Sequence, residues 1–165
     1  MKTLYLVRHA KSSWAIEDIA DKDRPLKGRG IRDAHLISRY LGETINQPMN
    51  IQLSSSSAKR ALHTAFIFAQ NFGIPAGEIR VVDALYHCDW KQIQDEVRQT
   101  DDEVDFLFLF AHNPGITEYV NKITNAGIKN VPTTGVVGIG YQSNRWLALP
   151  AEGKCMLFEY PKRFK

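Results

Sequence analysis

Cysteine is scarce in this sequence, which has only Cys88 and Cys155 among its 165 residues. The two lie far apart, and neither has a second cysteine at the short spacing that zinc-binding and redox motifs use. We therefore expect two reduced thiols, in the core or partly buried, rather than a disulfide framework. The acidic residues at 18–23 do not form a calcium-binding loop either, because Leu26 stands where that loop needs a glycine. No metal and no other cofactor are predicted.

Long apolar runs are absent from the N-terminal part of the chain. The first apolar run starts at Leu4 and is ended by Arg8 and His9. Such a run is too short for the hydrophobic region of a signal peptide or for a membrane-spanning helix. We therefore expect a cytoplasmic protein with no membrane partner.

No sign of charge dominates the chain. It has 21 Lys and Arg residues against 18 Asp and Glu residues, which gives a net charge of +3. Because the basic residues are scattered among acids, the uniform basic stripe of nucleic-acid-binding proteins is missing. We expect no nucleic-acid partner, and we expect anions to be bound in a local pocket.

Strand-like and helical segments alternate along most of the sequence. Short apolar runs predict strands at 3–7, 51–53, 79–82 and 105–110. Helical spacing of apolar residues, with Gly42 and Gly73 as stop signals, predicts helices at 30–41, 58–72, 90–98 and 114–125. Two further strands, at 135–141 and 155–160, have no helix between them and should pair antiparallel. The prediction is one α/β domain over residues 1–165, a three-layer α/β/α sandwich with a mainly parallel central sheet, and a monomer is favoured.

Two histidines stand directly after predicted strands. His9 follows Arg8 at the end of the first strand, and His112 follows the strand at 105–110. Arg60 follows the strand at 51–53 in a similar way. Ligands bind outside the carboxyl ends of parallel strands, so these four side chains should meet in one crevice. Two arginines and two histidines together are suited to hold a phosphoryl group, and one histidine can attack it.

Three separated segments carry a resemblance to a known family. Leu4-Tyr5-Leu6-Val7-Arg8-His9-Ala10 resembles the Arg-His-Gly signature of the histidine phosphatase (phosphoglycerate mutase-like) superfamily. The segment 54–64 is similar to its Ser-x-x-x-Arg-Ala-x-x-Thr motif, and 112–115 is similar to its second histidine motif. Ala10 in place of the signature glycine, with Asp23-Arg24-Pro25-Leu26 and Gly30 beyond, resembles the short SixA-type phosphohistidine phosphatases. The resemblance covers residues 4 to about 125.

The resemblance implies a role for each motif residue. His9 is expected to be the nucleophile, since a neutral imidazole can attack phosphorus when its other ring nitrogen is held by a hydrogen bond. Arg8 and Arg60 are expected to clamp the equatorial phosphoryl oxygens. His112 is expected to donate a hydrogen bond to a phosphoryl oxygen. Ser56 is a candidate phosphate contact, although helix-cap chemistry explains it equally well.

Other residues near the motifs have simpler interpretations. Trp14 is predicted to pack rather than to stack on a ligand, and Arg24 is predicted to pair with Asp21 or Asp23. Three further histidines match no catalytic position and are predicted to be surface or structural residues: His35, His63 and His87.

The wider family carries a glutamate, after the third strand, that protonates the leaving oxygen. Here the corresponding stretch, 85–90, contains no glutamate. An alkoxide leaving group needs that proton, whereas the imidazole of a phosphohistidine departs with far less help. The missing acid favours phosphohistidine as substrate. Asp89, or else Asp83, as a substitute acid keeps open a small-molecule phosphomonoesterase or mutase.

The favoured prediction is a metal-independent phosphohydrolase that removes phosphate from phosphohistidine on a protein. The stretch from 73 to 105 is too short for a strand, a helix and a long lid, so an open site for a phosphorylated protein is expected. A small phosphorylated substrate is the alternative. The alternative of a different class is a non-catalytic module that binds phosphate or a phosphoprotein. The presence of both histidines and both arginines argues against it.

Overall fold

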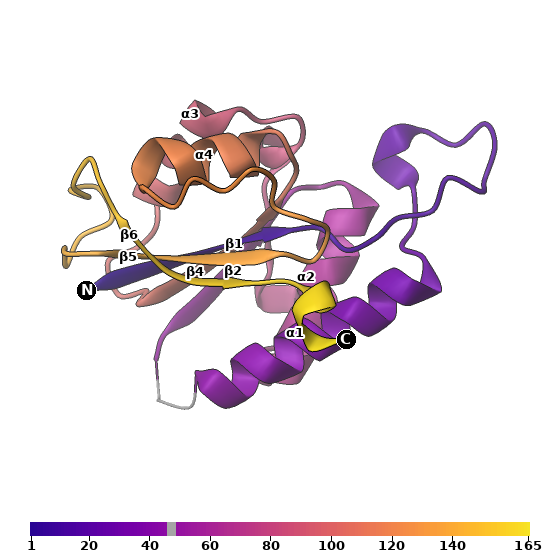
Figure 1. The fold of residues 1–165 in the computed structure, drawn as a ribbon, viewed down its shortest axis with the longest axis horizontal. Helices are drawn as coiled ribbons and strands as arrows, with labels where there is room; N and C mark the ends of the chain where they lie inside the picture. The colour runs from indigo at the N-terminus through magenta and orange to yellow at the C-terminus, as the bar shows by residue number, and fades with distance from the viewer. Residues whose placement is uncertain (46–48) are drawn as a thin grey trace.

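The computed structural model describes residues 1–45 and 49–165, and its centre is one six-stranded sheet. Figure 1 shows the sheet edge-on, with helices on both faces. The strand order is β3-β2-β4-β1-β5-β6. The strands are β1 (Lys2–Arg8), β2 (Ile51–Ser55), β3 (Arg80–Val81), β4 (Phe106–Ala111), β5 (Val136–Tyr141) and β6 (Lys154–Glu159). The helices are α1 (Gly28–Thr44), α2 (Lys59–Phe72), α3 (Trp90–Arg98) and α4 (Gly115–Ile123).

The predicted three-layer arrangement is confirmed. Helices α1 and α2 lie on one face of the sheet, and α3 and α4 lie on the other (Figure 1). Successive residues of β4 point to opposite faces, so Leu107 and Leu109 join the core under α3 and α4, whereas Phe108 and Phe110 join the core under α1 and α2. A strand buried on both faces requires the nearly continuous apolar sequence that β4 has.

The parallel half of the sheet brings three strand ends to one edge. β1 and β2 both pair parallel with β4, and their last residues, Arg8 and Ser55, lie opposite Ala111 and Phe110. The ladder continues beyond these ends, because the His9 and Ser56 amides donate to carbonyls of β4. The residues that follow β1, β2 and β4 are therefore neighbours. As predicted, β5 pairs antiparallel with β6; it also pairs antiparallel with β1, which the sequence did not indicate.

One predicted stop signal is wrong. Gly42 lies inside α1, which continues to Thr44. A Cβ at residue 42 would make only ordinary contacts with α2, the nearest at 3.4 Å from the Asn71 carbonyl oxygen, so packing does not require glycine there. Gly73, by contrast, ends α2 in the left-handed conformation with φ 70°, as predicted.

Smaller differences concern the other ends. β3 has only two residues, because a 3-10 turn (Asp83–Leu85) begins right after Val82. α4 ends at Ile123, before the predicted limit of 125. Both cysteines are free, Cys88 buried and Cys155 half-buried. None of the described helices has the length and apolar character needed to span a bilayer.

Candidate active site

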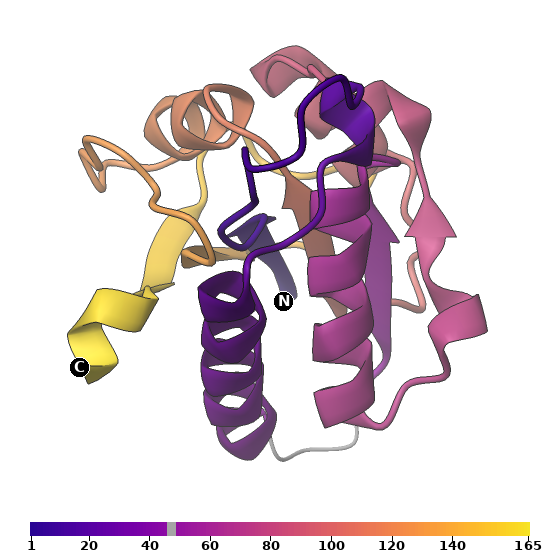
Figure 2. The ribbon, with the colours of Figure 1, turned by 90° about the vertical axis from the view of Figure 1, so that its right-hand side faces the viewer.

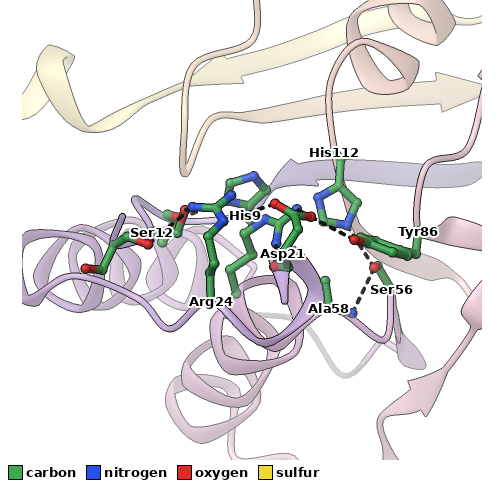
Figure 3. Close-up of polar contacts among 11 residues, drawn as sticks. His9, Ser12, Asp21, Arg24, Ser56, Ala58, Tyr86 and His112 are labelled. Carbon is green, nitrogen blue, oxygen red and sulfur yellow. Dashed lines mark hydrogen bonds and ion pairs between the residues drawn. The ribbon is translucent and has the colours of Figure 1, made fainter. Parts of the chain in front are cut away.

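The side chains that follow β1, β2 and β4 meet at the carboxyl edge of the sheet. The rings of His9 and His112 lie 5.2 Å apart between their centroids. Figure 3 shows both rings facing the segment of Asp21 and Arg24, which belongs to the loop between β1 and α1. The two histidine motifs, which lie far apart in the sequence, therefore form one site. The loop after β1 lines one side of that site.

His9 is held by its own strand end. The ring is buried, and its Nδ1 lies 2.8 Å from the Ala10 carbonyl oxygen. Because a carbonyl only accepts hydrogen bonds, Nδ1 must carry the proton of the neutral ring, which leaves a lone pair on Nε2. The Ala10 amide in turn donates to the Thr64 hydroxyl on α2 at 3.0 Å. The helix thus fixes the backbone that orients the His9 ring.

His112 is held by Ser56, the residue that follows β2. Its Nε2 lies 2.8 Å from the Ser56 Oγ. That oxygen also accepts a hydrogen bond from the Ala58 amide at the start of α2, at 3.2 Å. Ser56 is therefore not the cap of α2 that the sequence predicts, because the N-cap residue is Ala58; it closes a turn before the helix and contacts the second histidine. Nδ1 of His112 is buried and has no hydrogen-bond partner among the described residues.

Both rings are neutral at physiological pH. Burial of the ring lowers the pKa of His9 from 6.5 to about 4; the Ala10 hydrogen bond raises it in part, and neighbouring arginines lower it again. The pKa of His112 is likewise lowered to about 3, mainly by burial and then by the neighbouring His9 and Arg60. A neutral ring with a free lone pair is the form that can act as a nucleophile.

Arg8 and Arg60 supply the positive charge. Arg8 donates from Nη1 to the Val131 carbonyl oxygen at 3.0 Å. Arg60 is buried and donates to Asp21 twice, from Nη1 to the backbone oxygen at 2.7 Å and from Nη2 to Oδ2 at 3.0 Å. In both side chains Nε is buried and has no partner among the described residues. A buried N–H without a partner is costly, and a bound anion removes that cost.

A carboxylate that the motifs do not include is central to the site. Asp21 Oδ2 accepts from Arg60 and also from the Tyr86 hydroxyl at 2.7 Å, while its Oδ1 accepts from Arg24 Nε at 3.0 Å (Figure 3). Hydrogen bonds from Tyr86 and then from the two arginines hold the pKa of the Asp21 carboxyl well below its usual range. Asp21 is therefore ionised at physiological pH. Its pairing with Arg24 was predicted, whereas the contacts with Tyr86 and Arg60 had no signal in the sequence.

At the rim of the site, the position of Trp14 differs from the prediction. Trp14 does not pack into the core: its side chain is 75% exposed, and the Arg24 guanidinium lies 3.5 Å from its ring centroid. Arg24 itself is buried and donates to the Ser12 hydroxyl at 2.6 Å. The apolar ring thus covers the arginine from the solvent side, because a planar cation stacks well on an aromatic face. His87 is exposed, as predicted, and its ring lies 3.9 Å from that of Tyr86.

The two carboxylates considered as substitute acids have other partners. Asp89 caps α3, where its Oδ1 accepts from the Gln92 amide at 2.9 Å in a capping box. Asp83 is exposed and pairs with Lys22 at 3.5 Å. Neither makes a hydrogen bond or ion pair with either site histidine in the described structure. Over residues 1–45 and 49–165, no three His, Cys, Asp or Glu side chains gather closely enough to share a metal ion.

The start of α4 adds a further positive element. The helix begins at Gly115, and its Ile116 amide donates to the His112 carbonyl oxygen at 3.1 Å. A Cβ at residue 115 would collide with the Cys88 carbonyl oxygen, so glycine lets the helix start this close to the loop after β3. The positive end of the helix dipole thereby lies beside His112. Two arginines, two neutral histidines and a helix N-terminus can together bind a phosphoryl group and attack it.

The depressed histidine pKa values give a direct prediction. In a titration followed by NMR, the imidazole signals of His9 and His112 should not shift between about pH 5.5 and 8, whereas in urea the same residues should titrate near 6.5. As the pH falls, these two histidines therefore bind protons at a higher pH in the unfolded chain than in the folded protein. Stability should therefore be full above about pH 6.5 and fall as the pH drops toward 4. A midpoint between pH 6 and 7 in the folded protein would contradict the buried, neutral state of these rings.

Comparison with known proteins identifies the family. Residues 4–124 match the histidine phosphatase superfamily (branch 1). The uncharacterized protein ML1117 of Mycobacterium leprae is 30% identical over 169 residues, which cover 94% of this chain and 100% of that protein. Among solved structures, the one named SixA from Agrobacterium tumefaciens has a TM-score of 0.78 at 24% identity, with 97% of this chain and 98% of that chain covered. A protein histidine phosphatase SixA solved with tungstate has a TM-score of 0.80 at 16% identity and covers 99% of each chain.

The matched region contains β1 from Leu4 onward, β2 and β4, and all of the residues at the edge where these strands end. The fold agrees over almost the whole chain with that of proteins named SixA. The chain therefore belongs to the histidine phosphatase superfamily, and it is a phosphatase with the fold of the short SixA-type branch.

Proposed function

We propose that this phosphatase hydrolyses phosphohistidine on a protein, without a metal ion, through a phosphohistidine intermediate on His9. The observation that carries the proposal is the neutral His9 ring, with Nδ1 bound to the Ala10 carbonyl and Nε2 free, beside the half-buried Arg8 and the buried Arg60. A phosphoryl group clamped by the arginines would present its phosphorus to Nε2.

The reaction consists of two transfers. In the first, the Nε2 lone pair of His9 forms a bond to phosphorus while the bond from phosphorus to the substrate nitrogen breaks. The electron pair of the broken bond stays on that nitrogen, and the substrate ring, protonated on its other nitrogen, departs as neutral imidazole. In the second, water attacks the phosphorus, inorganic phosphate leaves, and Nε2 regains its lone pair. The Ala10 carbonyl stabilises the positive ring of the intermediate, because it accepts the Nδ1 hydrogen throughout.

Arg8 and Arg60 have the geometry to stabilise the transferring group. Each has a buried Nε–H without a partner, which suits a phosphoryl oxygen. His112 adds a donor: the Ser56 hydroxyl accepts from the Ala58 amide and so can give its own hydrogen to His112 Nε2. Nδ1 of the neutral ring then carries the proton and is free to donate.

The choice of phosphohistidine over a phosphate ester rests on the leaving group. The stretch after β3 contains no glutamate, and Asp89 is engaged in the cap of α3. An alkoxide would thus depart without a proton donor in place, whereas an imidazole leaves a phosphorus–nitrogen bond much more easily. The cytoplasmic location, the single domain and the monomeric state stay predictions.

The leaving group also provides the test. With a phosphohistidine-bearing carrier protein, kcat/KM should exceed that for an alkyl phosphate by at least about a hundredfold, the usual value of general-acid assistance. Rates across a series of aryl phosphates should fall steeply as the phenol becomes more basic. Asp89→Asn should leave that slope unchanged.

Asparagine caps a helix as well as aspartate does, so Asp89→Asn tests proton donation without disturbing α3. A flat leaving-group series, or a selective loss on alkyl phosphates in Asp89→Asn, would show that a carboxylic acid serves this site. The small-molecule phosphomonoesterase or mutase would then be the better description.

A further inference from the structure

A groove lined by cations lies between α1 and the C-terminal 3-10 turn (Pro161–Phe164), apart from the catalytic edge of the sheet. Figure 2 shows the turn beside α1, and the two are joined by an edge-on contact of Tyr40 with Phe164, 5.0 Å between ring centroids. The groove has a volume of about 680 Å³. We call it the α1 groove; its charged lining is Arg29, Arg32, Asp33, Arg39 and Lys165.

The lining is far from electrically balanced. Four of its side chains are positive and only Asp33 is negative, so the excess equals the +3 net charge of the whole chain. Asp33 is buried and binds Lys165 Nζ at 2.7 Å, with Arg29 Nε at 3.8 Å. Arg32 and Arg39 are exposed and have no acidic partner within 4.0 Å among the described residues. The basic and acidic residues of the rest of the chain are therefore equal in number, and the whole excess of positive charge belongs to residues that line the groove.

The helix presents these arginines as a row. Positions 29, 32 and 39 lie on one face of α1, since their spacing is close to whole turns. Ten residues of helix extend about 15 Å. A single phosphate is too small to contact the whole row, whereas an acidic segment of a protein, with several carboxylates in line, matches its length and charge. Arginine also binds carboxylates with paired, planar hydrogen bonds, which makes it well suited to such a surface.

The first turn of α1, which contributes Arg29 to the groove, packs against the loop that follows His9. The Lys27 amide, just before α1, donates to the Lys11 carbonyl oxygen at 2.9 Å, and Lys11 is two residues beyond His9. Gly30, on the first turn of α1, lies so close to Lys11 that a Cβ there would collide with its backbone. A protein that presents a phosphohistidine to His9 can therefore extend over α1.

We propose that the α1 groove docks an acidic segment of the phosphoprotein whose phosphohistidine is hydrolysed at His9. This inference rests on the function proposed above. It assigns protein recognition to a surface that makes no contact with the transferring phosphoryl group, so docking and chemistry are separable by mutation.

The test is a charge reversal in the row. Arg32→Glu with Arg39→Glu removes two arginines that have no ion pair to lose, and glutamate is a good helix former at exposed positions. The variant should lose at least about tenfold in kcat/KM on an acidic phosphohistidine-bearing carrier protein, mainly through KM. Its activity on 4-nitrophenyl phosphate should stay within about twofold of wild type, since that small substrate does not reach α1.

A matched control makes the same change of charge elsewhere. Lys91→Glu with Lys122→Glu reverses two exposed lysines on α3 and α4, on the opposite face of the sheet. It should keep the carrier activity, and salt should weaken carrier turnover strongly in wild type but little in the α1 variant.

Two results would overturn the proposal in different ways. Equal carrier activity of wild type and the α1 variant, or equal losses in the α1 and control variants, would show that the α1 groove does not dock the substrate. If wild type hydrolyses 4-nitrophenyl phosphate but not the carrier protein, the proposed function itself fails, and the docking inference fails with it.

Discussion

His9→Ala should abolish turnover, with a loss of kcat on the order of 10⁴-fold or more, as for other enzymes deprived of their nucleophile. The reason lies in the ring: His9 Nε2 carries the free lone pair, while Nδ1 is engaged with Ala10. His112 cannot replace it, because its Nε2 is bound to Ser56. Folding should be kept, since the His9 side chain makes a single hydrogen bond to the next residue and stands at a loop edge rather than in either apolar core.

Rapid quench with labelled substrate provides the measurement. Wild type should yield an acid-labile, base-stable phosphoenzyme within one turnover, and His9→Ala should yield none. His63→Ala, at an exposed position on α2, is the matched control and should label as wild type does. Persistent labelling of His9→Ala would mean that another residue is the nucleophile.

The arginines should be nearly as sensitive. Arg60→Lys and Arg8→Lys should each reduce kcat/KM by about 10²- to 10³-fold, the usual effect of losing one fixed donor to the transition state. Arg60 already gives Nη1 and Nη2 to Asp21, and its remaining Nε–H is buried and unpartnered in the described structure. An ammonium group keeps the charge but lacks the planar set of donors that serves both Asp21 and a phosphoryl oxygen.

Steady-state kinetics on an aryl phosphate checks this expectation, with Arg98→Lys on the exposed face of α3 as the control for a conservative change. The control should match wild type. Rates close to wild type in both Arg8→Lys and Arg60→Lys would show that guanidinium geometry does not matter here, and the clamp would have to be sought elsewhere.

The fold was predictable wherever a local signal agreed with packing. The predicted helix at 90–98 coincides with α3, and the apolar run at 105–110 is β4 shifted by one residue. The stop signal at Gly42 failed because one glycine inside a helix costs only about 1 kcal/mol relative to alanine, and α1 continues past it to Thr44.

The site was predictable only where residues follow strands. His9 and His112 meet because β1 and β4 are parallel neighbours, which the sequence pattern indicates. The Tyr86 hydroxyl reaches Asp21 across 65 positions of sequence, from one loop to another. Loops have no hydrophobic period that would relate such residues, so only the three-dimensional structure shows this contact. Trp14 also lies in a loop, so no sequence period indicates that it is exposed.

The contact of Asp21 with Arg60 has a consequence for what happens after hydrolysis. A buried guanidinium that faced only phosphate would hold the product strongly, and release would limit the rate. Here Asp21 already engages two of its donors, Nη1 through its backbone carbonyl oxygen and Nη2 through its carboxylate. A phosphoryl oxygen bound at Nε therefore shares the guanidinium with Asp21, whose negative charge weakens the binding of substrate and of product phosphate alike. A site that binds substrate and product phosphate equally weakly need not bind the transition state less well. The weaker binding of product phosphate lets it dissociate faster.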